Sequence, residues 1–532
     1  MMKNLVILYG GGLTRHAFEK VFDGASAFGR VLSWAGAFGD RIVLLTETAP
    51  SDVSVNSEIA SFCGSGAGIE VISRDSWSKA DFISQIAGSL KKYDAARAVV
   101  SYADTPFLNE RLTRELLEMH ERYAAEYSFA DGFPYGLAPE IIESGAASIL
   151  SGLATSSLGE EGGKRMDREA LFSVMRGDIN SFEIETLISD VDYRLLRFEF
   201  ESSSRINALA CESLFDEARR QNIDVSDAYA LSDLASRTER VCRTVPAFYN
   251  IQISSRYNHR YCYSLEAAGK NPCARDFMPL SDFRRIMSEI AGFSESAVIS
   301  LSAFGEPLLN PEFLDFALDV ISMNDGSHRF PLLIETDGLL VTDALAAEIA
   351  AAASSRRAEV NWIVCADAVD KSSYTALHNC DEADFEKALA CIALLAGHFP
   401  RHVYPQFMRM RTNEAQLEPF YRFWSDKSSP SQGGLIIQKY NSVCGVLPDL
   451  KPADLSPVRR LPCWHLRRDM TILSDGTVPL CFQLSFPESA GNILTDGIGR
   501  VWDRARGVLE SHIAGEYPGN CSVCDESYTF NF

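Results

Sequence analysis

The sequence predicts an α/β protein with two sheet-containing parts, a less regular segment between them and a small cysteine-rich end. Three observations predict this class. Short runs rich in Val, Ile and Leu recur along both halves of the chain, segments of helical length separate them, and four of the 13 cysteines lie at Cys463 and beyond. At 532 residues the chain is long enough to bury several cores.

Residues 1–150 are predicted to form a mostly parallel α/β sheet. The expected strands are Asn4–Tyr9, Arg41–Thr46, Ile69–Ser73 and Ala98–Tyr102. Gly10, Gly11 and Gly12 follow the first strand, and successive glycines let backbone amides approach a phosphate group. Asp104 follows the fourth strand, where a carboxylate is a candidate ligand for the Mg²⁺ of a bound nucleotide. These four residues form a candidate nucleotide site.

Residues 151–245 are expected to be a connecting region. They open with the Gly-, Ser- and Glu-rich stretch 151–164, which is typical of a loop. Acidic helical segments such as Leu214–Gln221 follow, and the regular alternation of strands and helices resumes only at residue 246.

Residues 246–450 predict a full or partial (βα)6 barrel. The six expected strands are Phe248–Ser254, Ala297–Ser302, Pro331–Glu335, Val360–Cys365, Val403–Met408 and Gly434–Lys439, with helical segments between them. In such barrels the chemistry lies at the carboxyl ends of the strands. Polar or glycine-containing clusters follow the first three strands, at residues 256–260, 305–307 and 336–338. Periodicity alone does not distinguish a barrel from an open sheet.

Residues 455–532 are too few for a large core and are predicted to be held by a metal centre. Cys463 and Cys481 flank the turn signal Ser474–Asp475–Gly476, which predicts a hairpin that brings the two cysteines together. Cys521 and Cys524 form a C-x2-C pair, which lets two thiolates reach one metal. Four thiolates suit a structural zinc or an iron–sulfur cluster, and the spacing leaves both open.

The same segment resembles a SPASM domain, which follows radical S-adenosylmethionine (radical SAM) enzymes and holds auxiliary four-iron four-sulfur clusters. The resemblance lies in Pro462–Cys463–Trp464, Asp475–Gly476–Thr477–Val478, Cys481, Gly491–Asn492, Trp502 and Cys521–Ser522–Val523–Cys524. It implies iron–sulfur rather than zinc. The longer family pattern has more cysteines and holds two clusters, whereas four cysteines are enough for one.

The predicted barrel resembles a radical SAM core. Gly305–Glu306–Pro307 resembles the segment that engages the methionine amino group of the cofactor, and Glu335–Thr336–Asp337–Gly338 resembles the third-strand segment near its ribose. Gln406, Arg409 and Asn413 resemble further family positions. The resemblance implies an S-adenosylmethionine pocket with Gly305, Glu306, Pro307, Glu335 and Thr336. The alternative is that Gly-Glu-Pro is a structural turn before a capped helix.

The cysteine motif that defines the radical SAM family is missing. Its pattern, C-x3-C-x2-C, falls here on Tyr257, Tyr261 and Ser264, while Cys262 is displaced by one position. A tyrosine would ligate iron only as a phenolate, at a cost set by its pKa of about 10. We therefore expect no radical-generating cluster. The alternative is that Cys262, Cys273 and Cys242 rebuild one.

Residues 1–150 resemble sugar-nucleotide or cytidylyltransferase-like domains. The resemblance lies in the glycines after the first strand, in Asp104–Thr105–Pro106 and in Asp131–Gly132–Phe133–Pro134–Tyr135–Gly136. The basic signature of that family departs from its usual spacing, since only Arg15 and Lys20 are near the glycines. A working nucleotidyltransferase, a nucleotide-binding relic and a purely structural domain all remain open.

The charge balance narrows the choice of partners. Lys and Arg number 50 against 72 Asp and Glu, so the net charge of −22 disfavours nucleic acid as a partner. No apolar run reaches the roughly 18 residues of a membrane span, so no membrane partner is expected. We expect a cytoplasmic protein, in which disulfides do not persist.

Together these features resemble the group called spiro-SPASM proteins. The first hypothesis is an iron–sulfur protein of radical SAM/SPASM descent with one auxiliary 4Fe–4S cluster on Cys463, Cys481, Cys521 and Cys524. It would bind a peptide, protein or small-molecule partner or substrate without generating a radical. The alternatives are an active radical SAM enzyme that modifies peptides or proteins, and a nucleotidyltransferase whose C-terminal half is scaffold. Whether the chain is an enzyme stays open.

Overall fold

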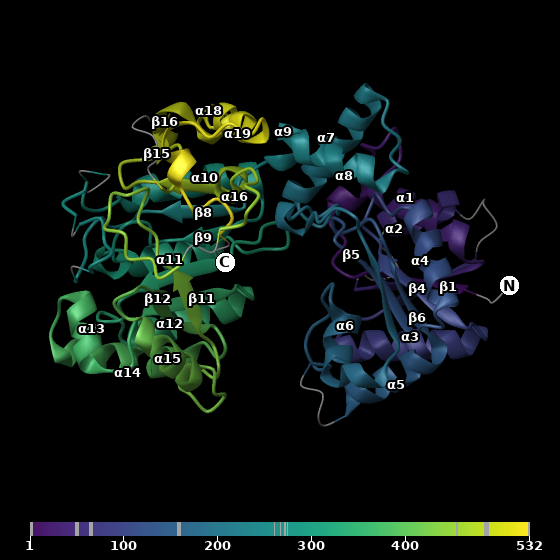
Figure 1. Cartoon of the computed structure of the whole chain (residues 1–532), viewed down its shortest axis with the longest axis horizontal. Coiled ribbons are helices and arrows are strands. Elements are labelled where there is room, and N and C mark those ends of the chain that lie inside the picture. Colours follow the sequence, from purple (N-terminus) through teal and green to yellow (C-terminus); the bar gives the residue numbers. More distant parts are fainter. Residues whose placement is uncertain are drawn as a thin grey trace. The chain divides into compact units, whose positions relative to one another are not determined.

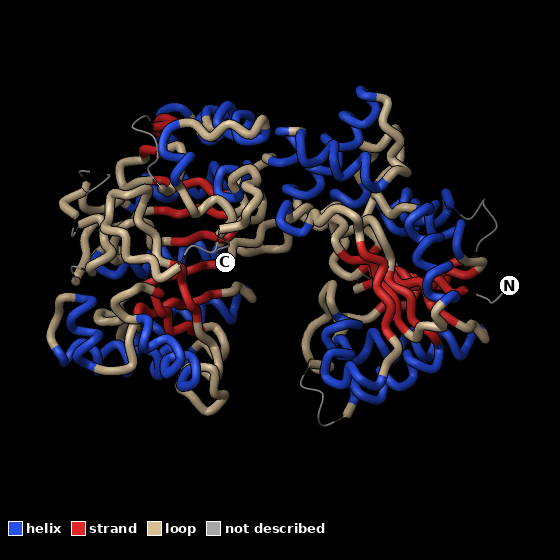
Figure 2. The backbone as a smooth tube through the Cα atoms, in the orientation of Figure 1, coloured by secondary structure: helices blue, strands red, loops and turns tan. Residues whose placement is uncertain are grey.

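Two seven-stranded sheets organise the part of the chain that the computed structural model describes, one in each of the units Met1–Thr244 and Val245–Phe532. The described residues are 4–47, 53–62, 68–156, 161–259, 261–266, 268–270, 273, 275–453, 456–483 and 489–529. Figures 1 and 2 show the strands of each sheet with helices packed on them. The prediction of an α/β fold is confirmed.

The first unit has a mixed sheet. Its strands are β1 (Asn4–Gly10), β2 (Arg41–Thr46), β3 (Gly68–Ser73), β4 (Arg97–Tyr102), β5 (Tyr127–Asp131), β6 (Glu140–Glu143) and β7 (Ile184–Ile188). They lie in the order β3-β2-β1-β4-β6-β5-β7. The first four are parallel, as predicted, whereas β6 runs antiparallel to both β4 and β5.

Helices cover both faces of this sheet because the apolar residues of its central strands alternate between two cores. In β1, Leu5 and Ile7 belong to one core, and Val6 and Leu8 to the other. Helices α3 (Lys79–Tyr93), α5 (Ser144–Thr155) and α6 (Ala170–Met175) pack on the first core. Helices α1 (Ala27–Phe38), α2 (Val53–Phe62) and α4 (Glu110–Arg122) pack on the second, so the two sets lie on opposite sides of the sheet in Figure 1.

The segment predicted as a connecting region, 151–245, belongs to the first unit instead. Its strand β7 pairs in parallel with β5 at the edge of the sheet. It also supplies α7 (Arg205–Gln221), α8 (Ala228–Arg237) and α9 (Glu239–Cys242). The sequence signal for β7 is weak because an edge strand is only half-buried and therefore lacks a clear apolar pattern.

The second unit has an all-parallel main sheet. Its strands are β8 (Phe248–Ile251), β9 (Val298–Ser300), β10 (Leu332–Thr336), β11 (Val360–Cys365), β12 (Val403–Arg409), β13 (Ile436–Lys439) and β14 (Asp469–Ile472). Their order is β13-β12-β11-β10-β9-β8-β14. All six predicted strands are present. Because β13 and β14 lie at opposite edges of this order, the barrel is partial rather than closed.

Helices pack on the main core of the second unit. They include α10 (Leu280–Ser294), α11 (Phe313–Ser322), α12 (Asp343–Arg356), α14 (Glu382–His398) and α15 (Leu417–Trp424). The shorter helices of this unit are α13 (Lys371–His378), α16 (Trp464–Arg468), α17 (Ile493–Asp496), α18 (Ile498–Arg504) and α19 (Arg506–Ile513).

The predicted hairpin between Cys463 and Cys481 is wrong in its strand pairing. The turn is present, with Gly476 at φ +86°, where a side chain would be strained. However, β14 extends the main sheet beside β8, while β15 (Thr477–Pro479) pairs antiparallel with β16 (Ser489–Asn492). The physical reason is that the edge of β8 offers β14 a full parallel ladder.

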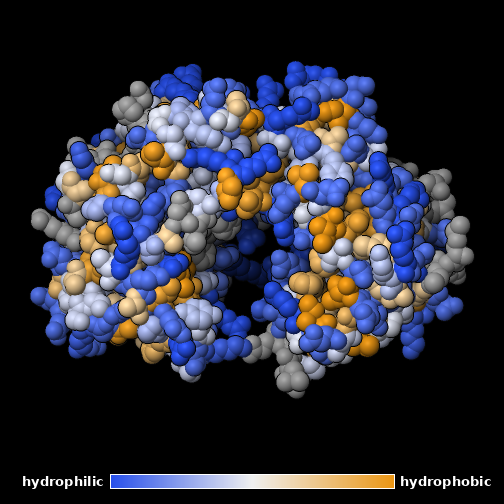
Figure 3. Space-filling view, in the orientation of Figure 1, coloured by the Kyte–Doolittle hydropathy of each residue, from blue (hydrophilic) through white to orange (hydrophobic). Residues whose placement is uncertain are grey.

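The visible surface is mixed in polarity. On the face shown in Figure 3, hydrophilic side chains spread over both units and hydrophobic ones form scattered groups. Of the helices that the structure describes, none combines the length and the apolar character that a membrane crossing requires.

Glu140 on β6 makes the stability of the first unit depend on pH. Burial raises the pKa of this carboxyl from its usual 4.5 to about 7, although Tyr127 donates a hydrogen bond to it. The folded state therefore binds the proton more tightly than the unfolded chain does. The resulting stabilisation is complete below pH 4.5 and is lost as the pH rises through 7, by about 3 kcal/mol in all.

We expect Glu140→Gln to remove this part of the pH dependence. Urea unfolding of the wild type and of the variant at pH 5 and pH 8 measures it. Relative to the wild type, the variant should have a higher free energy of unfolding at pH 8 than at pH 5. A difference that is the same at both pH values would contradict the assignment.

Candidate functional site

A cavity of about 180 Å³ lies at the carboxyl ends of the strands in the second unit. Its walls come from the segments after β8, β9 and β13 and from the ends of β10, β11 and β12. This is the edge at which barrel folds carry their chemistry. We refer to this cavity as the strand-end pocket.

The three positions that replace the radical SAM cysteines all line the strand-end pocket. They are Tyr257, Tyr261 and Ser264. Burial raises the pKa of both tyrosines, and the Ser264 hydroxyl donates to the Tyr261 carbonyl at 3.0 Å. These groups are therefore neutral hydroxyls. Their chemistry does not fit a cluster that needs three thiolates.

The cysteines of the alternative cluster have separate partners. The Cys262 sulfur lies 4.0 Å from the Met410 sulfur, and the Ser474 hydroxyl lies 3.1 Å from the Cys273 sulfur. The Cys242 thiol donates to the Ala235 carbonyl at 3.3 Å, within the first unit. These contacts do not support a rebuilt cluster. Cys365, by contrast, lies in the pocket wall at the end of β11.

The Gly-Glu-Pro segment is built into the protein framework. The Glu306 carboxylate accepts hydrogen bonds from the Leu308 amide at 3.1 Å, the Thr336 hydroxyl at 2.9 Å and the Asp337 amide at 2.9 Å. A Cβ at Gly305 would lie 2.0 Å from the Ser254 carbonyl oxygen, so only glycine fits there. Of the five predicted S-adenosylmethionine residues, Gly305, Glu306, Glu335 and Thr336 line the pocket, while Pro307 begins the short 3-10 helix Pro307–Leu309.

The three further radical SAM-like positions, Gln406, Arg409 and Asn413, are not among the residues that line the pocket, and each has a protein partner. The Gln406 amide donates to Glu335 at 3.0 Å, and the Asn258 amide donates to Asp337 at 2.8 Å. Arg409 forms an ion pair with Glu414 at 2.6 Å, and the Asn413 amide donates to the Asp367 carbonyl at 3.1 Å. Burial raises the pKa of the Glu335 carboxyl, which faces the cavity.

The four C-terminal cysteines share one neighbourhood. Cys463 precedes α16, Cys481 follows β15, and Cys521 and Cys524 belong to the last turn, 519–524. Cys463 interacts electrostatically with Cys481 and Cys524, and so does Cys521. Burial raises the pKa of Cys521 to about 12 and also raises that of Cys463.

Backbone amides point at these sulfur atoms. The amides of His465 and Leu466 donate to the Cys463 sulfur, and that of Glu526 donates to the Cys524 sulfur. Such hydrogen bonds favour thiolates and occur around the sulfurs of iron–sulfur clusters. The donor set therefore fits the predicted metal centre.

In the first unit, the glycines and Asp104 meet at the carboxyl edge of adjacent strands. Gly10 ends β1 and Asp104 follows β4, its parallel neighbour. Arg168 pairs with Asp104 at 2.6 Å and with Glu201 at 2.6 Å. Asp104 Oδ1 is buried without a hydrogen-bond partner among the described residues. Arg168 thus holds the carboxylate that was predicted to bind Mg²⁺.

Arg168 and Glu201 were missed because both lie in the stretch predicted as a connector. The Arg168 guanidinium also donates to the Tyr135 hydroxyl at 3.0 Å, and it lies over the rings of Tyr135 and Tyr102. Tyr135 belongs to the motif at residues 131–136, which follows β5. This motif therefore helps to hold Arg168.

Comparison with known proteins decides the family. A protein of Treponema pallidum (strain Nichols), described as "Uncharacterized protein", is 37% identical over 373 residues, which cover 68% of this chain and 98% of the relative. The chain belongs to the family of this treponemal protein. Residues 463–525 match the SPASM family model, described as an iron–sulfur cluster-binding domain. The SPASM prediction is confirmed.

Two solved structures are similar to parts of the chain. BtrN in complex with AdoMet and 2-DOIA is 15% identical, with a TM-score of 0.34, and covers 55% of this chain and 94% of its own. A cytidylyltransferase from Leptospira borgpetersenii serovar Hardjo-bovis (strain JB197) is 14% identical, with a TM-score of 0.34, and covers 44% of this chain and 92% of its own.

A fifth cysteine lies beside the SPASM domain and was missed from the sequence. The Cys444 thiol is within hydrogen-bonding reach of the Cys524 thiol. Its turn is strained, because Val443, Cys444 and Gly445 all have positive φ, at 50°, 52° and 85°. Val443 also lines the strand-end pocket, so this turn connects the pocket with the cysteines. In the sequence, the only sign of this cysteine's position was the Val-Cys-Gly segment that follows the last predicted barrel strand.

Proposed function

We propose that the SPASM domain holds one four-iron four-sulfur cluster on Cys463, Cys481, Cys521 and Cys524. The domain match supports an iron–sulfur centre, and the shared neighbourhood of the four thiols supports a single one. A cluster with all four irons bound by thiolates supplies electron transfer. The protein's contribution is the four thiolates and the amides that donate to them.

The spacing of the thiols favours a cluster over one zinc ion. Zinc holds four sulfurs by bonds of about 2.3 Å, which places the sulfurs roughly 3.8 Å apart. Among the described residues, no three of these four sulfur atoms lie within 4.8 Å of one another. A cubane of irons and sulfides is larger than one ion and spreads its cysteines further apart.

We infer that the strand-end pocket binds a partner or substrate and generates no radical. The observation that carries this inference is the occupation of the three ligand positions by Tyr257, Tyr261 and Ser264, all in the pocket wall and all protonated. Glu306 already has three protein donors, which supports a structural role for the Gly-Glu-Pro segment.

Anaerobic reconstitution with iron and sulfide tests both parts of the proposal. We expect about four irons per chain and no 5′-deoxyadenosine when S-adenosylmethionine and dithionite are added. About eight irons with cleavage of S-adenosylmethionine would instead establish an active radical enzyme. Zinc retained in place of iron would overturn the cluster.

A further inference from the structure

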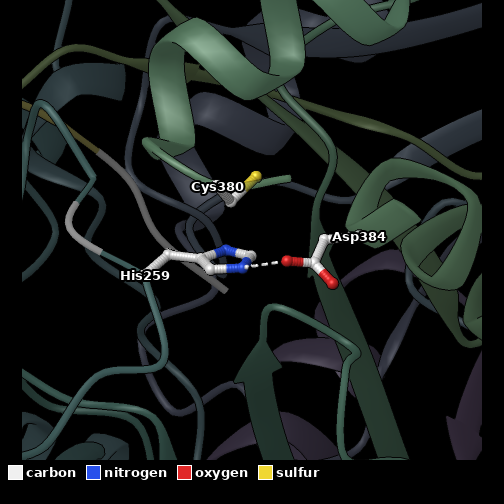
Figure 4. A group of neighbouring side chains, drawn as sticks. All are labelled: His259, Cys380 and Asp384. Atoms are coloured by element: carbon white, nitrogen blue, oxygen red, sulfur yellow. Dashed lines mark hydrogen bonds and ion pairs between the residues drawn. The ribbon is translucent and has the colours of Figure 1, made fainter. Parts of the chain in front are cut away.

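Three side chains with metal-binding chemistry converge at a second place in the second unit. They are His259, Cys380 and Asp384, and one ligand atom from each lies within 4.8 Å of the other two. Figure 4 shows Cys380 above the imidazole of His259 and Asp384 beside it. His259 comes from the loop after β8, Cys380 follows α13, and Asp384 lies in the first turn of α14. The SPASM cysteines take no part in this group.

One nitrogen of this group is buried without a partner. His259 is 5% exposed. Its Nε2 lies 3.2 Å from Asp384 Oδ2, while its Nδ1 is buried and has no hydrogen-bond partner among the described residues. In Figure 4 this second nitrogen lies on the edge of the ring that faces Cys380. The metal that we consider lies on the Nε2 side of the ring, because the 3.2 Å between Nε2 and Asp384 Oδ2 is the separation of two ligands that share one ion. The buried Nδ1 would then carry the proton of the imidazole.

The local structure holds the other two ligands in place. Helix α13 ends at Asn379, whose φ of +51° turns the chain sharply, and Cys380 follows at once. The first turn of α14 then presents Asp384. Lys387 pairs with Asp384 Oδ1 at 2.8 Å, which leaves Oδ2 directed at His259. A carboxylate oriented through its second oxygen is typical of a supported metal ligand.

We propose that His259, Cys380 and Asp384 bind a divalent metal ion of the zinc type. An imidazole nitrogen, a thiolate and a carboxylate form a mixed set that suits zinc, whose bonds to them are about 2.0–2.3 Å long. Ligand atoms with such bonds lie roughly 3.3–3.8 Å from one another. Side-chain rotation therefore has to close the present separations of up to 4.8 Å when the metal binds. The Cys380 thiol gives its proton to solvent as the metal–sulfur bond forms. Three protein ligands leave one position for water.

The site would fix the loop that forms one wall of the strand-end pocket. Asn258, next to His259, donates its amide to Asp337 of the pocket wall. The His259 ring also contacts that of Tyr261, with centroids 5.9 Å apart. A metal on His259 would therefore hold Tyr261 in position. This inference does not depend on the proposed cluster or on the absence of radical chemistry.

Zinc binding to the cluster-loaded full chain tests the proposal. One equivalent of zinc is added anaerobically, weakly bound metal is dialysed away, and zinc is counted and examined by X-ray absorption. We expect about one zinc per chain with a single sulfur ligand. Cys380→Ser and Asp384→Asn should each weaken zinc binding about 100-fold while the iron content is unchanged. Cys391→Ser, which removes a buried thiol of α14 outside the group, should leave zinc bound.

Two results would overturn the proposal. One is that the wild type retains no zinc. The other is a zinc with four sulfur ligands that survives Cys380→Ser and disappears in Cys521→Ala, because that zinc would occupy the SPASM cysteines. Circular dichroism of each variant verifies folding. If a variant does not fold, the single-sulfur absorption signature of the wild type still decides the question.

Discussion

Replacing Cys521 by alanine is expected to lower the iron content of the reconstituted protein from about four atoms per chain to near zero. Cys521 is 6% exposed and lies in the last turn together with Cys524. Its burial raises the thiol pKa to about 12, so only a metal keeps a thiolate there at neutral pH. Alanine removes the ligand without adding bulk. Iron analysis and the visible absorption of the cluster measure the loss.

Two further variants separate ligands from other cysteines. Cys211→Ala removes a buried thiol of the first unit, which donates to the Glu201 carbonyl at 3.6 Å, and should leave the iron content unchanged. Cys444→Ser should also keep about four irons, since four other thiolates suffice. Iron that persists in Cys524→Ser and disappears in the Cys444/Cys524 double variant would show that Cys444 can replace Cys524. Full iron in Cys521→Ala would contradict the cluster assignment.

Replacing Arg168 by alanine is expected to destabilise the first unit by about 3 kcal/mol at pH 7. The guanidinium pairs with Asp104 and Glu201, whose side chains are only 8% and 6% exposed. Removing it leaves two buried carboxylates with like charge and no cation. Burial already raises the pKa of Glu201 in the intact protein, so protonation relieves the defect as the pH falls. Urea unfolding at pH 7 and pH 5 should show a smaller loss at pH 5.

A double-mutant comparison assigns this loss to the carboxylates. In an Asp104→Asn background, Arg168→Ala should cost less than in the wild type, because one of the two charges is already gone. Arg168→Lys keeps the charge but loses the fork that reaches both partners, and should fall between wild type and alanine. An Arg168→Ala protein as stable as the wild type at pH 7 would refute the role given to this residue.

Local sequence patterns predicted a strand or a turn correctly where the residues of that element alone determine it. The central strands of both sheets are apolar runs because helices bury both faces of the first sheet and one face of the second. The C-x2-C pair and the turn at Gly476 are equally local. The prediction missed β7 and gave β14 the wrong partner. Strand pairing depends on which sheet edge is available, and residue spacing and propensity do not contain that information.

The same distinction applies to the pocket. The sequence placed Tyr257, Tyr261 and Ser264 at the cysteine positions, and the structure puts all three in the cavity wall. The sequence did not indicate that three protein donors hold Glu306 or that Gly305 lies against Ser254, since these contacts join separate strands.

By itself the sequence determined the α/β class, the strands of the barrel and the SPASM domain, because apolar runs and cysteine spacing are properties of short segments. Only the tertiary structure decided which distant residues meet. Arg168 joins Asp104 and Glu201, Cys444 lies beside Cys524, and His259 meets Cys380 and Asp384. The physical reason is that strand order and strained turns bring these side chains together. Their spacing along the sequence does not predict such contacts.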